Sequence, residues 1–159
     1  MELEQIRKPK SYQNGKIYCI RSFQTDLIYI GSTTQPLSKR FSLHKRNYNC
    51  WKNNKANYIT SFELLKYDDC YIELLEDYSC NSNNELQRRE GQLIREIEKV
   101  VNKFIAGRTN AEYKFDNRDK IRKKIQCECG GHHLYNHTAR HLKTNKHKKY
   151  IDKQSKDNI

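Results

Sequence analysis

Residues 16–31, KIYCIRSFQTDLIYIG, form the stretch that decides the fold. Lys16 to Arg21 (KIYCIR) and Leu27 to Gly31 (LIYIG) are both rich in β-branched and aromatic residues, which favour strands. The segment from Ser22 to Asp26 joins them and is short enough for a hairpin connection. The stretch therefore predicts two antiparallel strands.

Helical and strand patterns follow this hairpin. After Pro36, large side chains recur at helical spacing, namely at Leu37, Phe41, His44, Tyr48 and Trp51. A short helix around Ser61 to Lys66 and a strand over Tyr71 to Leu75 come next. The clearest helix is predicted from Asn84 to Val101, because Asn83 or Asn84 is a good N-cap for the apolar stripe that follows. The order predicts an α/β fold, with a small three-stranded antiparallel sheet flanked by helices.

The composition restricts the classes that remain. A chain of 159 residues allows one domain, or one domain with a small module. No apolar run approaches the roughly 20 residues that cross a bilayer, and the segment from Met1 to Lys16 lacks the apolar part of a secretory signal. Four scattered cysteines without paired spacing are interpreted as free thiols, namely Cys19, Cys50, Cys70 and Cys80. We expect no membrane partner and an intracellular, reducing compartment (cytoplasm or nucleus) rather than secretion.

The charge is strongly positive and unevenly spread. Lys and Arg outnumber Asp and Glu by 31 to 19, which gives a formal net charge of +12. Residues 113–159 hold 13 Lys and Arg against 5 Asp and Glu, so most of the excess lies in the C-terminal part. Such a surplus favours a polyanionic partner, although charge alone fits a basic surface without a specific partner equally well.

Glu90 lies among the apolar residues of the predicted long helix. An unpaired carboxylate in that position is costly, so it needs a cation or strong hydrogen-bond donors. The simpler interpretation is partial exposure, or an ion pair with Arg88 or Arg89. Arg40 and His44 lie one turn apart on the first helix and project from the same side. Taken singly, Arg40 is explained as a solvated charge and His44 as a half-buried residue that only contributes to packing.

Together these positions resemble the GIY-YIG family of nucleases. Lys16-Ile17-Tyr18 and Tyr29-Ile30-Gly31 look like its two signature triplets, and the step of eleven residues between the tyrosines fits. Four further positions match family residues in the right order, namely Arg40, His44, Glu90 and Asn102. The resemblance covers roughly residues 14–106. The fragment YIGSTT (29–34) and the segment CNSNNEL (80–86) further resemble versions carried by large DNA viruses, which suggests a virus-infected host cell.

The resemblance implies a metal-dependent endonuclease that hydrolyses phosphodiester bonds in DNA. Glu90 would hold Mg²⁺ or Mn²⁺, Tyr18 would act as the general base on the attacking water, and Arg40 would stabilise the phosphate. The pKa of an unperturbed tyrosine is about 10, so nearby positive charge must lower that of Tyr18. Tyr29 and His44 would position the water or the phosphate. Asn102 would orient Glu90 or the local backbone.

Two departures from the family pattern stand out. The first triplet begins with Lys16, and its glycine stands one position earlier at Gly15. This is tolerable because the tyrosine hydroxyl carries the chemistry. Many members place a lysine directly after the second triplet, where this chain has Ser32. The cation that replaces that lysine is left open among Lys39, Lys45 and Arg46.

Residues 127–147, CECGGHHLYNHTARHLKTNKH, form a second constellation. Zinc binds Cys and His in closed tetrahedral sets, and small modules use such a site in place of a core. The predicted ligands are Cys127, Cys129, His141 and His147, with a spacing that resembles matrin-type two-Cys, two-His fingers. Only one residue separates the cysteines, and competing ligands are present at His132, His133 and above all His137. The alternative is a disordered basic tail with incidental cysteines.

The predicted organisation is a nuclease-like domain (14–106), a charged linker or basic helix (107–126), a zinc-finger-like module (127–150) and a disordered tail (151–159). The partner is DNA, with structured or branched DNA and RNA left open, and no small-molecule cofactor is expected. Phosphate contacts, which position rather than specify, are predicted from Arg140, Lys143, Lys146, Lys148 and Lys149. Two other functions compete: a catalytically inactive nucleic-acid-binding protein on the same scaffold, and a zinc-stapled module that binds proteins. The latter leaves Glu90 unexplained.

Overall fold

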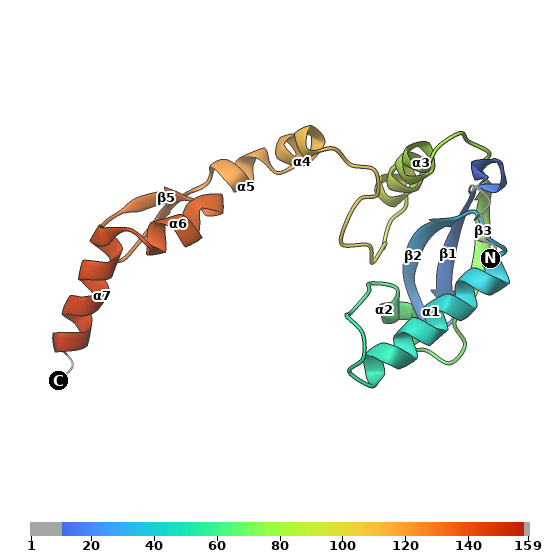
Figure 1. The fold of residues 1–159 in the computed structure, drawn as a ribbon, viewed down its shortest axis with the longest axis horizontal. Coiled ribbons are helices and arrows are strands. Elements are labelled where there is room, and N and C mark those ends of the chain that lie inside the picture. The colour runs from blue at the N-terminus through green and yellow to red at the C-terminus, as the bar shows by residue number, and fades with distance from the viewer. Residues whose placement is uncertain (1–10, 158–159) are drawn as a thin grey trace, which may run out of the picture. The chain divides into compact units, whose positions relative to one another are not determined.

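The computed structural model describes residues 11–157. The chain forms two compact units, the first ending at Arg108 and the second beginning at Thr109 (Figure 1). Across the described residues, every helix is too short or too polar to cross a membrane. Residues 1–10, which contain most of the segment tested above for a secretory signal, lie outside the described part.

The first unit is built on three antiparallel strands. These are β1 (Lys16–Ser22), β2 (Thr25–Thr33) and β3 (Tyr71–Asp77), in the order β2-β1-β3. The β1–β2 hairpin pairs Tyr18 with Gly31 and Ile20 with Tyr29. The central strand is the most deeply buried part of the molecule, and Ile17 to Ile20 have no exposed surface. The predicted hairpin and the α/β fold class are confirmed.

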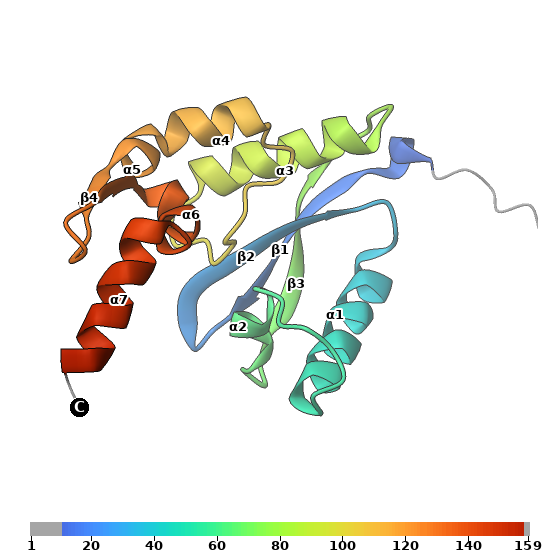
Figure 2. The same cartoon turned by 60° about the vertical axis from the view of Figure 1, so that its left-hand side comes forward.

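Helices cover both faces of this sheet (Figure 2). A single 3-10 turn, η1 (Tyr12–Asn14), precedes the sheet, and α1 (Leu37–Lys52) and α2 (Phe62–Leu65) lie between β2 and β3 in the chain. The helices α1 and α2 pack against Tyr18, Ile20 and Tyr29. The helix α3 (Asn83–Glu96) packs its apolar stripe against Ile17 and Ile30 on the other face. The apolar faces of these helices thus pack into two separate cores, one on each side of the sheet. Side chains of β1 point alternately into one core and the other.

The predicted extent of the long helix is wrong at its C-terminal end. The helix α3 begins after Ser82, whose side chain accepts a hydrogen bond from the backbone N–H of Glu85, and it ends at Glu96 instead of Val101. Val100 instead forms a parallel bridge with Ile28 of β2. The strand β2 lies at the edge of the sheet, so its outer backbone groups have no partner strand. The backbone groups of Lys99 and Val101 form hydrogen bonds with those of Ile28, in place of a further helical turn.

The second unit is a chain of short elements. These are α4 (Asn110–Asp116), α5 (Arg118–Arg122), the hairpin of β4 (Lys124–Gln126) and β5 (His132–Leu134), η2 (Tyr135–His137), α6 (Thr138–Leu142) and α7 (Asn145–Asp157). The segment left open as a linker or a basic helix therefore contains two helices, the first with a capping box between Thr109 and Glu112.

In the structure, α7 extends over residues 151–157 of the tail that the sequence predicts to be disordered. Lys and Gln lose little side-chain freedom in a helix, and the Ser155 hydroxyl donates to the Ile151 carbonyl 3.0 Å away. Residues 158–159 of the predicted tail lie outside the described part.

Candidate active site and metal centre

The Tyr18 hydroxyl lies between two side chains of α1. Arg40 Nε donates to it at 2.9 Å, and His44 Nε2 lies 2.8 Å from it. The phenol O–H finds its acceptor when it donates a hydrogen bond to His44 Nε2, in the tautomer that carries the ring hydrogen on Nδ1. The other ring nitrogen of His44, Nδ1, then donates to Ser61 Oγ, 3.0 Å away. Tyr18, His44 and Ser61 therefore form a buried hydrogen-bond chain that reaches from β1 across α1 to the start of α2.

Burial controls the protonation of this chain. It lowers the pKa of His44 to about 4, and the positive charge of Arg40 adds to that shift. Burial also raises the pKa of Tyr18, although Arg40 opposes it by its charge and its hydrogen bond. The sequence-based expectation of a lowered tyrosine pKa is therefore wrong, because desolvation outweighs the nearby cation. Near neutral pH the pair is a phenol and a neutral imidazole.

Two other predicted site residues shape β2 around Tyr18. The Tyr29 ring packs edge-on against His44, with the ring centres 5.5 Å apart. The Asn102 amide binds both backbone groups of Ile30, accepting from its N–H at 2.9 Å and donating to its carbonyl at 2.8 Å. Asn102 therefore fixes the backbone of β2, which was one of its two predicted roles. At Gly31 a β-carbon would lie 2.5 Å from the Tyr18 hydroxyl, so the glycine makes room for the ring.

Glu90 is half-buried on α3 and is bound to the residue that follows Gly31. The Ser32 hydroxyl donates to Glu90 Oε2 at 2.5 Å, and the Ser32 backbone adds a second hydrogen bond. Burial raises the pKa of Glu90, while Ser32 and the charge of Arg40 oppose that shift. The ion-pair interpretation fails for Arg89, which binds Glu76 at 2.8 Å. Both hydrogen bonds to the Glu90 carboxylate thus come from Ser32.

Electrostatic interactions connect Glu90 with the tyrosine chain. Its negative charge raises the pKa of Tyr18 and of Tyr29, and Arg40 acts on Glu90 in turn. A cleft of about 220 Å³ opens between β2, α1 and α3, and both Ser32 and Arg40 line it. Tyr18 has no exposed surface, and Arg40 donates a hydrogen bond to its hydroxyl oxygen. Water therefore reaches that hydroxyl only when the arginine moves.

Two contacts bear on the position of the missing lysine. Arg40 itself is the cation at Tyr18, and Ser32 serves as the hydrogen-bond donor to Glu90. Lys39 and Arg46 line a separate cleft along α1, and Lys45 lies over the Phe41 ring at 4.4 Å. The sequence-based reasoning missed the roles of both serines. Ser32 was detectable because it directly follows the second triplet, whereas no pattern in the sequence points to Ser61.

The four predicted zinc ligands come together in the second unit. Cys127 Sγ lies 3.4 Å from His147 Nδ1, and Cys129 Sγ lies 3.3 Å from His141 Nε2. All four ligand atoms lie within 4.8 Å of one another. A tetrahedral zinc site with ordinary bond lengths has sulfur–nitrogen edges of about 3.6 Å, so this set fits a zinc ion. The turn between strands β4 and β5 contains Gly130 at a φ of 72°, a conformation that favours glycine.

The competing histidines lie outside this cluster. His137 Nδ1 accepts from Arg140 3.1 Å away, and His132 is exposed on β5. His133 stacks on the His141 ring at 4.5 Å and lies 3.2 Å from the Thr138 hydroxyl. Of the two pairs weighed from the sequence, the geometry therefore favours His141 with His147.

Comparison with known protein families places the sequence of the first unit in a class of nuclease domains. The family model of the GIY-YIG catalytic domain matches residues 14–104, the range that contains the sheet, the helix arginine and the half-buried carboxylate. The chain belongs to the GIY-YIG family. Nucleic acid is the substrate class of that family, and its members typically use divalent metals. Neither the curated proteins nor the solved structures give a match.

Proposed function

We propose that the chain is a divalent-metal-dependent endonuclease that hydrolyses phosphodiester bonds in DNA. Tyr18 is the general base, Arg40 stabilises the phosphate, and Glu90 is the Mg²⁺ ligand. The observation that carries this assignment is the setting of Glu90: a half-buried carboxylate, held by Ser32, within electrostatic reach of Tyr18 and Arg40. Mg²⁺ and Mn²⁺ prefer such oxygen ligands.

When bound, the ion supplies charge neutralisation at the phosphate and at the leaving oxygen. Arg40 contributes the donors for a non-bridging phosphate oxygen, which its planar guanidinium fits. Drawing Arg40 towards the phosphate opens the Tyr18 hydroxyl to water. It also removes one of the two causes that lower the pKa of His44. Substrate binding thereby prepares the base.

Proton transfer then runs along the buried chain. A water proton passes to the Tyr18 oxygen while the phenol proton passes to His44 Nε2, and the water oxygen bonds to phosphorus as the bond to the 3′ oxygen breaks. His44 carries the proton as imidazolium, with its Nδ1–H held by Ser61. Because burial lowers the pKa of His44 to about 4, the imidazolium returns its proton to the Tyr18 oxygen after the step, the Tyr18 oxygen gives one proton to solvent, and the 3′ oxygen takes one from solvent.

The proton chain predicts an unusual pH dependence. The neutral Tyr18–His44 pair moves its proton internally, so single-turnover cleavage should change less than tenfold between about pH 6.5 and pH 8.5. In His44→Gln, which retains a polar side chain but accepts no proton, the residual rate should rise about tenfold per pH unit, because phenolate must form by loss of a proton to solvent. Cleavage rates at matched Mg²⁺ concentrations measure this. Parallel profiles for the two proteins would exclude the chain.

The activity itself is tested with supercoiled plasmid and a panel of labelled substrates: duplex, flap, junction and single-stranded DNA, and RNA. We expect nicked or linear plasmid with Mg²⁺ and none without added divalent ions. The panel identifies the preferred substrate. DNA binding without cleavage of any substrate, with either Mg²⁺ or Mn²⁺, would instead support the catalytically inactive alternative.

For the second unit we propose a zinc module that binds DNA through phosphates. Support comes from the four-ligand cluster and from the exposure of all five predicted contacts: Arg140, Lys143, Lys146, Lys148 and Lys149. Lys146 Nζ additionally donates to the Gly130 carbonyl at 2.9 Å, which braces the turn between β4 and β5. The matrin-type character, the viral origin and the intracellular, reducing compartment stay predictions.

Metal analysis tests the ligand set. The purified chain should contain one zinc ion, and Cys127→Ser or His147→Asn should reduce that content at least tenfold at limiting zinc, because an open set of three ligands binds far more weakly. The control is His137→Asn, which should retain full zinc content. The opposite order, with zinc lost from His137→Asn and kept in His147→Asn, would transfer the fourth ligand to His137.

A further inference from the structure

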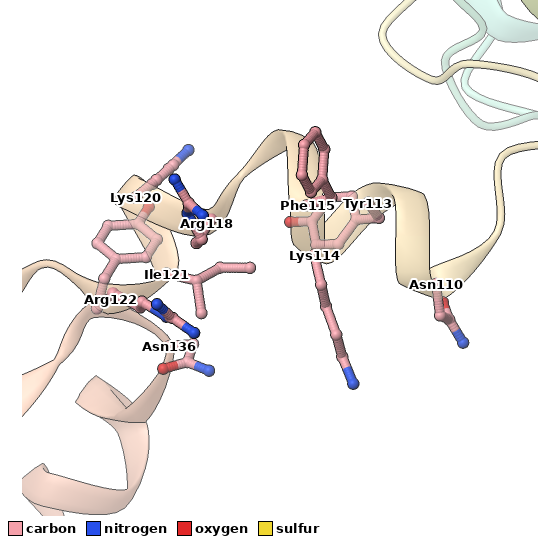
Figure 3. A pocket seen from close by; sticks show the side chains of 10 residues that line it. Asn110, Tyr113, Lys114, Phe115, Arg118, Lys120, Ile121, Arg122 and Asn136 are labelled. Carbon is pink, nitrogen blue, oxygen red and sulfur yellow. The ribbon is translucent and has the colours of Figure 1, made fainter.

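An open pocket of about 890 Å³ lies within the second unit (Figure 3), and its lining includes none of the four zinc ligands. The side chains that line it come from α4, α5 and η2. Three aromatic residues are among them, and all are substantially exposed: Tyr113 by 47%, Phe115 by 76% and Tyr135 by 48%. Exposed apolar side chains scattered singly are common, but these three line one pocket, and apolar surface gathered in this way marks interaction sites.

The charged residues of the pocket are all of one sign. Lys114, Arg118, Lys120 and Arg122 line it, and no Asp or Glu does so among the described residues. Lys120 Nζ lies 5.2 Å over the Tyr135 ring, which places a cation beside an aromatic face. Arg118 forms an ion pair with the neighbouring Asp119 at 3.8 Å, and both side chains are largely exposed, so this pair competes weakly with a ligand. The pocket is therefore open to an anion.

Exposed rings beside cations are the features that bind unpaired nucleotides. Bases stack on aromatic faces, and Lys and Arg contact the phosphates between them. Duplex DNA would engage the cations, but its bases are already stacked and offer no faces to the rings. An acidic peptide would likewise contact the cations, but its carboxylates would not stack on the three rings. Phe115, the most exposed of the three, has no polar group that would explain its exposure.

We propose that this pocket binds unpaired nucleotides of the DNA substrate. The inference rests on the proposed function, since it assigns to the nuclease a preference for DNA with a single-stranded segment, such as a flap or a junction. The zinc module would supply phosphate contacts to any DNA, and the pocket would select the unpaired strand. The two binding modes differ in their chemistry, so single variants separate them.

Fluorescence anisotropy tests the proposal on the zinc-loaded full chain without Mg²⁺. The probes are a twelve-nucleotide oligo-dT, a duplex of equal length, and the corresponding oligo-U. Phe115→Ala should weaken oligo-dT binding at least about fivefold, the lower end of the loss for one stacked base, and leave duplex binding within twofold. Phe115→Leu, which retains apolar bulk but no ring face, should behave like Phe115→Ala.

Phe104→Ala is the matched control, because Phe104 is 83% exposed and lies in the first unit, outside the pocket. It should bind all probes like the wild type. Arg118→Gln should weaken both DNA probes and reduce the salt dependence of binding. Wild-type oligo-dT binding by both Phe115 variants, or an equal loss for the duplex, would overturn the proposal. Tighter binding of oligo-U than of oligo-dT would replace DNA by RNA as the occupant.

Binding is measured without catalysis, so its result is independent of the nuclease assignment. Absence of the Phe115 effect would overturn the assignment of the pocket and would not bear on whether the chain cleaves DNA with Mg²⁺. Conversely, a chain that cuts nothing would still show whether Phe115 distinguishes an unpaired strand from a duplex. The failures of the two proposals are therefore distinguishable.

Discussion

Glu90→Gln is expected to lower the rate of Mg²⁺-dependent cleavage by at least about 10³-fold, because a bound metal stabilises the transition state by several kcal/mol. Glutamine still accepts the hydrogen bond from Ser32, which is 2.5 Å from the carboxylate. The change therefore removes the negative charge and little else. Single-turnover cleavage at saturating protein measures the effect, and DNA binding without Mg²⁺ should be unchanged.

A matched control lies on the same helix. Glu96 is exposed at the end of α3, so Glu96→Gln should cleave at the wild-type rate. If both variants cut at the wild-type rate with Mg²⁺ present, Glu90 is a structural residue and the proposed mechanism is wrong. Equal losses in both variants would point to a general effect of charge on DNA binding.

Tyr18→Phe is expected to reduce cleavage by about 10²- to 10⁴-fold, the usual contribution of a general base. The substitution removes the one oxygen that both Arg40 and His44 contact, and it preserves the ring in a position without exposed surface. It leaves His44 Nε2 without its partner, so a stability loss of about 1–3 kcal/mol is also expected. Cleavage should therefore be measured well below the melting temperature.

Tyr78→Phe controls for the loss of a tyrosine hydroxyl elsewhere, since Tyr78 packs against the core cluster on the α3 face of the sheet, the face opposite the Tyr18 ring. It should cut at the wild-type rate. Retention of full activity by Tyr18→Phe would mean that another group activates the water.

The arrangement of Tyr18, Arg40 and His44 was largely predictable from sequence. The hairpin register sets Tyr18 opposite Gly31, and the spacing of four residues on α1 brings Arg40 and His44 to the same hydroxyl. These are local patterns with fixed periods. Ser61 was not predictable, because its contact with His44 depends on how the loop after α1 folds back, and no period describes that path.

Other errors share this cause. The helix α3 was overextended because Val100 and Val101 continue its apolar stripe, whereas the free edge of β2 attracts them into a bridge. The pKa of Tyr18 was misjudged because a sequence shows nearby charges but not the degree of burial. In the second unit, the choice between His137 and His147 depended on the break between α6 and α7, which directs His147 to Cys127.

The position of the divalent ion is the most direct test of the central claim, that Glu90 holds it beside Tyr18. Fe²⁺ in place of Mg²⁺, with ascorbate and peroxide, generates radicals that cut the polypeptide near the bound metal, and mass spectrometry locates the cuts. The account predicts cuts near residues 31–32 and 90 in the wild type, and their loss in Glu90→Gln. The same cuts in both proteins, or none near these residues in the wild type, would contradict it.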